Sequence, residues 1–135
     1  GLYNFGSAHT TGDTAVYLKQ SNILHMGDVF NMSGFPFIDA DNGGNIDGII
    51  YFCQSILSVI NDETVVVPGH GPISTTQDMQ NYIDMLVVVR DRIKNLIDKE
   101  KTLEEVLEAH PAQEWEAGFG DATLLVDRAY TGLLN

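Results

Sequence analysis

The segment Val65–Pro72 constrains the fold most strongly, because it joins a strand directly to a tight turn. Its first part, Val65–Val67, is a run of β-branched residues, which is typical of a strand covered on both faces. Pro68 has no backbone N–H, so the pattern predicts that the strand ends there. His70 follows between two glycines, whose missing Cβ atoms allow a tight turn and a close approach of the imidazole to another group. Two interpretations stay open: a functional histidine, or a turn in which the histidine is incidental.

Composition limits the classes of function. The chain has 135 residues, which suits one domain with a hydrophobic core. Seven Lys and Arg residues against nineteen Asp and Glu residues give a net charge of −12. This balance argues against nucleic acid and anionic membranes as partners, because both are bound through positive patches. We expect no membrane-spanning run and no signal segment, but the chain starts at Gly1 rather than at methionine, so the localisation stays unknown.

The apolar pattern predicts an α+β fold in a single domain, 1–135. Cys53 is the single cysteine, and it follows an apolar run that places it in the core. Thr75 and Thr102 each precede an acidic residue by three positions, which is the spacing of a helix capping box. Strands are expected at 15–18, 23–26 and 64–67 with an edge strand within 1–8, helices at 46–60, 75–99 and 103–109 and after Asp121, and a turn at Trp115.

Residues 29–45 form a long segment with neither helical nor strand periodicity, and a loop of this length is often functional. Its aromatic residues Phe30, Phe35 and Phe37 allow two interpretations. They wall a substrate pocket, or they anchor the loop to its own domain.

Three candidate metal ligands lie in glycine-flanked or polar segments next to predicted strands: His9, Asp28 and His70. Asp28 is expected where the 23–26 strand ends, a position from which a side chain reaches a site above a sheet. Imidazole nitrogen and carboxylate oxygen suit zinc, with iron or manganese as alternatives.

Three segments in this order, His9–Thr14, Ile23–Asp28 and Val67–Pro72, resemble the second half of the metallo-β-lactamase superfamily. The loop from Phe37 to Gly44 is similar to that of its hydrolase-like and cyclase-like branches. The resemblance covers 1–95 and leaves 96–135 as a helical carboxy-terminal extension. It implies half of an αββα sandwich, with a mixed or antiparallel sheet and helices on one face.

The resemblance also implies roles for individual residues. His9 corresponds to a histidine of the first zinc site, Asp28 to the carboxylate that bridges two metals, and His70 to the histidine of the second zinc. Asp13 is either an outer group that orients a ligand by hydrogen bonding or a simple turn cap. The implied chemistry is metal-dependent hydrolysis of an ester, thioester, amide or phosphoester.

The sequence departs from the family in one large respect. The signature His-x-His-x-Asp-His, which supplies most of the metal ligands, has no match here. We therefore expect a carboxy-terminal fragment of a zinc-dependent hydrolase that is inactive as an isolated chain, and whether it binds metal stays open. The alternative is a non-catalytic domain that forms a homodimer through its exposed sheet face. The partner is then either a second copy or a missing amino-terminal half.

Overall fold

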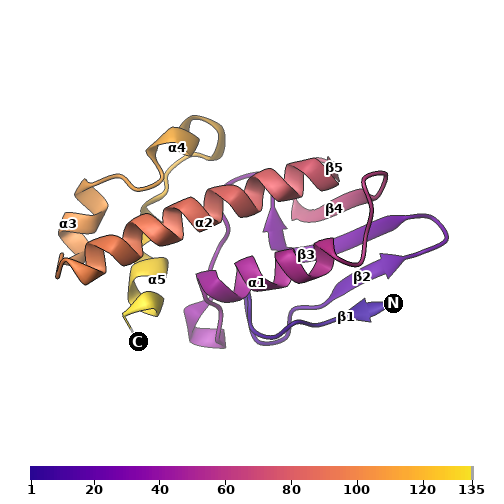
Figure 1. Cartoon of the computed structure of the whole chain (residues 1–135), viewed down its shortest axis with the longest axis horizontal. Helices are drawn as coiled ribbons and strands as arrows, with labels where there is room; N and C mark the ends of the chain where they lie inside the picture. Colours follow the sequence, from indigo (N-terminus) through magenta and orange to yellow (C-terminus); the bar gives the residue numbers. More distant parts are fainter. Residues whose placement is uncertain (135) are drawn as a thin grey trace.

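A computed structural model describes residues 1–134 as a five-stranded sheet with helices packed on it (Figure 1). The elements follow one another as β1 (Leu2–Tyr3), β2 (Ala15–Leu18), β3 (Ile23–Asn31), a 3₁₀ turn η1 (Ala40–Asn42), α1 (Ile46–Leu57), β4 (Val65–His70), β5 (Ser74–Thr75), α2 (Thr76–Asp98), α3 (Leu103–Glu108), α4 (Gln113–Phe119) and α5 (Thr123–Leu133). The described chain is therefore a mixed α+β structure, as predicted.

The sheet has the strand order β1-β2-β3-β4-β5 and is mixed. β3 and β4 pair in parallel, whereas the other neighbouring strands pair antiparallel. A parallel pair needs a crossover connection, and α1 supplies it. Figure 1 shows α1 and α2 side by side in front of the sheet, with α3, α4 and α5 grouped beyond its left-hand end.

One hydrophobic core joins the sheet, the two covering helices and the carboxy-terminal helices. β3 contributes Leu24 and Met26, and α1 contributes Phe52 and Cys53, all fully buried. α5 adds buried side chains to the same cluster, so this carboxy-terminal helix packs on the sheet-bearing part of the molecule. The prediction that Cys53 is a core residue is confirmed, and burial raises the pKa of its thiol far above the ordinary value.

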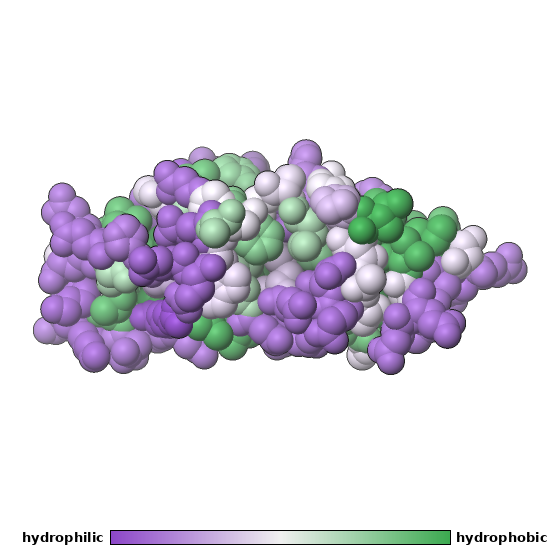
Figure 2. All heavy atoms as spheres, turned by 90° about the horizontal axis from the view of Figure 1, so that it is seen from above, coloured by the Kyte–Doolittle hydropathy of each residue, from purple (hydrophilic) through white to green (hydrophobic). Residues whose placement is uncertain are grey.

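The second face of the sheet carries apolar side chains without a covering layer. Leu2 is 76% exposed and Leu18 is 54% exposed. The strand register places two rows side by side on this face: Leu2, Val16, His25 and Val67 in one, and Leu18, Ile23, Val65 and Thr75 in the other. Figure 2 shows hydrophobic surface towards the right-hand side, next to a hydrophilic tip, whereas the left-hand end is mostly hydrophilic. The inference that Val65–Val67 is covered on both faces is therefore wrong within the described chain.

Two predicted strand ends are also wrong. β4 continues through Pro68 to His70, and β3 continues through Asp28 to Asn31. Proline is tolerated because the register shifts where Gly27 faces Pro68, and such irregular positions need no ladder hydrogen bond. Burial of the side chains after Asp28 keeps β3 in the sheet, so this carboxylate lies within a strand.

The helix predictions hold with small corrections. The capping boxes at Thr75 and Thr102 are confirmed. α1 ends at Leu57 rather than Ile60, because the next amides bond three residues back and tighten the last turn. Trp115 lies in α4 rather than in a turn. Within 1–134, none of the helices combines the length and the apolarity that a bilayer crossing requires.

We expect the Cys53 thiol to be inert in the folded chain, because burial suppresses the reactive thiolate and blocks access. A disulfide reagent that releases a chromophore should react at least about 100-fold more slowly with native protein than with protein in denaturant. Equal rates in both states would contradict the placement of Cys53 in the core.

Candidate metal centre

The three predicted metal ligands meet at one pocket. A cavity of about 300 Å³ is lined by His9, Asp28, Asn31, Phe37 and His70. These residues come from the loop before β2, from β3, from the segment after β3 and from the end of β4. Side chains far apart in the sequence are thus brought to one edge of the sheet.

The Asp28 carboxylate lies between the two imidazoles. Its Oδ1 is 3.2 Å from Nε2 of His70, and its Oδ2 is 3.7 Å from Nε2 of His9. The His9 side chain is 15% exposed and that of His70 is 66% exposed, so one side of the site is packed and the other is open. The two nitrogens face different oxygens, which is how a carboxylate shared by two cations is arranged.

The irregular pairing of β3 with β4 creates this juxtaposition. Gly27 faces Pro68 and Asn31 faces His70, so β3 has three residues between these partners where β4 has one. Extra residues in one strand bend it and redirect its side chains. Asp28 lies in this bulged stretch, and its side chain consequently reaches His70.

Gly69 allows the two strands to approach closely. A Cβ atom at this position would lie 2.5 Å from the carbonyl oxygen of Gly27 and 2.6 Å from Oδ1 of Asp28. Both distances are well below van der Waals contact. A side chain here would therefore occupy the place of the Asp28 carboxylate.

Backbone hydrogen bonds hold the loop that carries His9. The amide of Asp39 donates to the carbonyl of His9 at 3.1 Å, and the amide of Asn45 donates to that of Ala8 at 2.8 Å. Asp13 accepts a hydrogen bond from the amide of Thr10 at 2.6 Å and does not line the pocket. Of its two proposed roles, this contact corresponds to the turn cap, since the carboxylate acts on the backbone.

The orientation of the His9 ring is set by a second contact. Nδ1 of His9 is hydrogen-bonded to the carbonyl oxygen of Phe37. Because a carbonyl oxygen only accepts, Nδ1 is the donor, and Nε2, which carries a lone pair in the neutral form of the ring, faces Asp28. A lone pair and a carboxylate oxygen facing each other are stabilised by a cation between them. His9 and Asp28 are therefore donors of the chemical types that bind metal ions.

The described residues do not form a complete set of metal ligands. In 1–134, no group of three or more His, Cys, Asp and Glu side chains is placed to hold a metal ion without further donors. His9 and His70 each approach Asp28, but on different oxygens. A metal ion between Asp28 and either histidine would therefore need further ligands.

The aromatic residues of the 29–45 segment have different roles. Phe37 lines the pocket beside His9, with ring centroids 5.7 Å apart. Phe30 is buried against Tyr82, and Phe35 packs on Phe119 of α4. One of the three thus walls the pocket and two anchor the segment.

Asn31 also lines the pocket, and the sequence patterns did not indicate it. Its Oδ1 accepts from the amide of Ser33 at 2.9 Å, and its Nδ2 donates to the carbonyl of Phe35 at 3.3 Å. Asparagine bonded to the backbone two residues later is typical of a turn, and this local spacing is the signal that would have found it.

Comparison with known proteins supports a relation to metal-dependent hydrolases. No known family profile matches the sequence. The probable metallo-hydrolase YqgX of Bacillus subtilis is 28% identical over 83 residues, covering 59% of this chain and 39% of that protein. The chain thus spans about two fifths of the length of this curated relative.

Solved structures show the same fold. A metallo-β-lactamase from Pontibacter korlensis has a TM-score of 0.55 at 23% identity, over 64% of this chain and 40% of that one. The sec-alkylsulfatase Pisa1 from Pseudomonas sp. has a TM-score of 0.74 at 17% identity, over 96% of this chain and 23% of that one. The chain has part of the metallo-β-lactamase fold, as the three sequence motifs predicted. With the curated relative, this supports a fragment of that superfamily.

We expect Gly69→Ala to destabilise the fold by about 1–3 kcal/mol, because the added methyl group overlaps Gly27 and Asp28. Gly118→Ala in α4 is the matched control. A Cβ there meets nothing within 4 Å, so the change should stabilise by about 0.5–1 kcal/mol. Urea unfolding of both variants measures the difference, and equal stabilities would contradict the close approach at Gly69.

Proposed function

We propose that this chain is the carboxy-terminal part of a zinc-dependent hydrolase and that His9, Asp28 and His70 are metal ligands. One observation carries the proposal: three side chains from separate segments line one pocket, with the Asp28 carboxylate between two imidazole nitrogens. Imidazole and carboxylate donors are those that zinc prefers in hydrolytic sites. The relation to a probable metallo-hydrolase supports the same chemistry.

The described residues would hold and orient the metal. A bound zinc ion supplies a Lewis acid that polarises the bond to be cleaved. The Phe37 carbonyl keeps Nε2 of His9 directed at the site, and Asp28 contributes one oxygen towards each histidine. Phe37 covers one side of the pocket, whereas exposed His70 leaves the other side open to a substrate. Esters, thioesters, amides and phosphoesters stay the candidate substrate classes.

The remaining ligands would come from an amino-terminal half that covers the open sheet face. Two features support this. The donors at the pocket are incomplete within 1–134, and the apolar rows of β1 to β4 lack a covering layer there. A second layer on this face would bury Leu18 and Val65 and bring further ligands to the same edge of the sheet.

Zinc titration tests the ligand assignment. We expect the purified chain to bind zinc in calorimetry and His70→Ala to weaken binding at least about 10-fold, since a ligand is lost. His110→Asn is the matched control, because His110 is exposed, lies outside the pocket and has the positive φ of 49° that asparagine tolerates. Its affinity should stay within about twofold of the parent chain. Equal affinities for the His70 and His110 variants would contradict the assignment.

The open sheet face supports self-association as a second candidate role. A bare apolar face should pair with another copy when no other layer covers it. We expect sedimentation velocity to show association that rises with concentration and is lost in Leu18→Asp. Leu124→Asp on α5, which replaces a similarly exposed leucine, should leave it unchanged. A monomeric parent chain would contradict this role. The coding sequence upstream of Gly1 tests whether a second copy or an amino-terminal half covers this face. A His-x-His-x-Asp-His segment there would favour the amino-terminal half.

A further inference from the structure

The segment Met32–Phe37 connects the candidate metal centre with the carboxy-terminal helices. At one end, the amide of Met32 donates to the carbonyl of His70 at 2.9 Å. At the other end, the carbonyl of Phe37 accepts the hydrogen bond from Nδ1 of His9. The backbone of this one segment is thus bonded to both candidate histidine ligands.

The middle of the segment rests on α4. The rings of Phe35 and Phe119 are 5.4 Å apart between centroids, with an interplanar angle of 46°. At Gly34, a Cβ atom would lie 3.5 Å from the carbonyl oxygen of Phe119, so the backbones are also close. A cavity of about 140 Å³, lined in part by Met32 and Phe119, adjoins this contact. The ring pair therefore supports the segment on that side, in addition to the hydrogen bond from Nδ2 of Asn31 to the carbonyl of Phe35.

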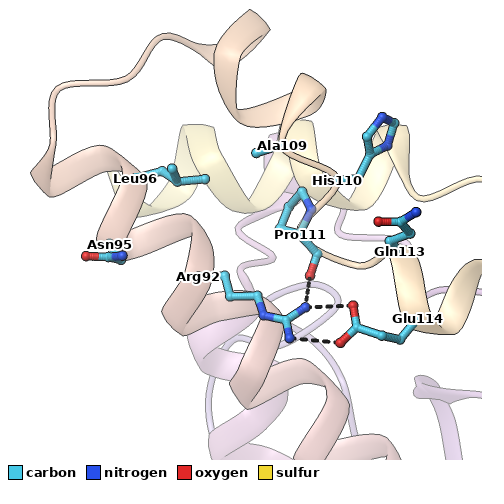
Figure 3. A pocket seen from close by; sticks show the side chains of 8 residues that line it. All are labelled: Arg92, Asn95, Leu96, Ala109, His110, Pro111, Gln113 and Glu114. Atoms are coloured by element: carbon cyan, nitrogen blue, oxygen red, sulfur yellow. Dashed lines mark hydrogen bonds and ion pairs between the residues drawn. The ribbon is translucent and has the colours of Figure 1, made fainter.

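α4 is itself fixed to α2 by a clamp around Arg92. Both oxygens of Glu114 accept hydrogen bonds from its guanidinium at 2.8 Å, and the carbonyl of Pro111 accepts another at 3.1 Å (Figure 3). The guanidinium also lies 5.7 Å from the ring of Trp115. This bonding holds the pKa of the Glu114 carboxyl below its ordinary value. The cavity shown in Figure 3 is therefore bordered by Arg92, whose guanidinium is already hydrogen-bonded to Glu114 and Pro111.

We propose that Phe119 is a positioning residue for the candidate metal centre. Through Phe35 it holds Met32–Phe37 against the sheet, so that the Phe37 carbonyl fixes the tautomer and the rotation of the His9 ring. The carboxy-terminal extension thereby acts on the site without touching it. The consequence for metal affinity rests on the proposed function, whereas the His9 hydrogen bond belongs to the metal-free chain.

The test is ¹⁵N NMR of the histidine rings in metal-free protein, at a pH at which the rings are neutral. In the parent chain, His9 should be almost entirely in the form with the proton on Nδ1. Phe119→Ala should give a mixture of the two tautomers. Phe119→Leu keeps apolar volume without the ring and should give a smaller change. Phe119→Tyr restores the ring and should match the parent chain.

Tyr130→Ala is the matched control, because Tyr130 is a half-buried aromatic residue of α5 that bonds to Lys101 instead of the segment. It should lower stability and leave the His9 tautomer unchanged. Parent-like His9 spectra in both the alanine and the leucine variants of Phe119 would overturn the proposal, and so would an equal change in Tyr130→Ala.

Zinc affinity gives the second measurement. Phe119→Ala should bind zinc about 10-fold more weakly than the parent chain, which is the loss typical of removing an outer support of a ligand. A tautomer change in a chain that binds no zinc would keep this inference and refute the proposed function. If zinc binds through His9 and Phe119→Ala changes neither the tautomer nor the affinity, the proposed function is kept and this inference is refuted.

Discussion

The parallel pairing of β3 with β4 is the constraint on which the rest of the structure depends. A parallel pair requires a long crossover, and α1 therefore crosses one face of the sheet and buries its apolar side chains there. The same pair contains the register shifts that give β3 extra residues next to β4. Asp28 lies in that bulged stretch, and the absence of a side chain at Gly69 leaves space for its carboxylate. The fold and the candidate site thus both depend on the irregular pairing of β3 with β4.

The orientation of the site depends on contacts beyond the sheet. His9 is held by backbone bonds to the segment around η1 and by the carbonyl of Phe37. The segment that ends at Phe37 is in turn supported by Phe35 on Phe119. The structural similarity to Pisa1 extends over 96% of this chain, so most of the helical extension has the same arrangement in that protein. The helical extension therefore belongs to the shared fold and lies next to the segment that supports the site.

The two faces of the sheet differ in how far they are covered. Helices bury one face, whereas leucine, isoleucine and valine side chains are left on the other. In our proposal, one further layer would cover the apolar face and add donors to the candidate site at one edge of the same sheet. The chain spans 39% of the length of the curated relative and 40% of that of the metallo-β-lactamase structure.

The sequence by itself determined the elements whose signals are local. The capping residues Thr75 and Thr102 predicted two helix starts, helical periodicity predicted α1 and α2, and three glycine-bearing motifs identified the fold and the residues that meet at the pocket. Tertiary structure alone decided that β3 continues past Asp28 and that β4 continues past Pro68, because strand ends depend on the register of the neighbouring strand. It also decided which aromatic residue lines the pocket and which nitrogen of His9 faces Asp28, since both follow from contacts between segments distant in sequence.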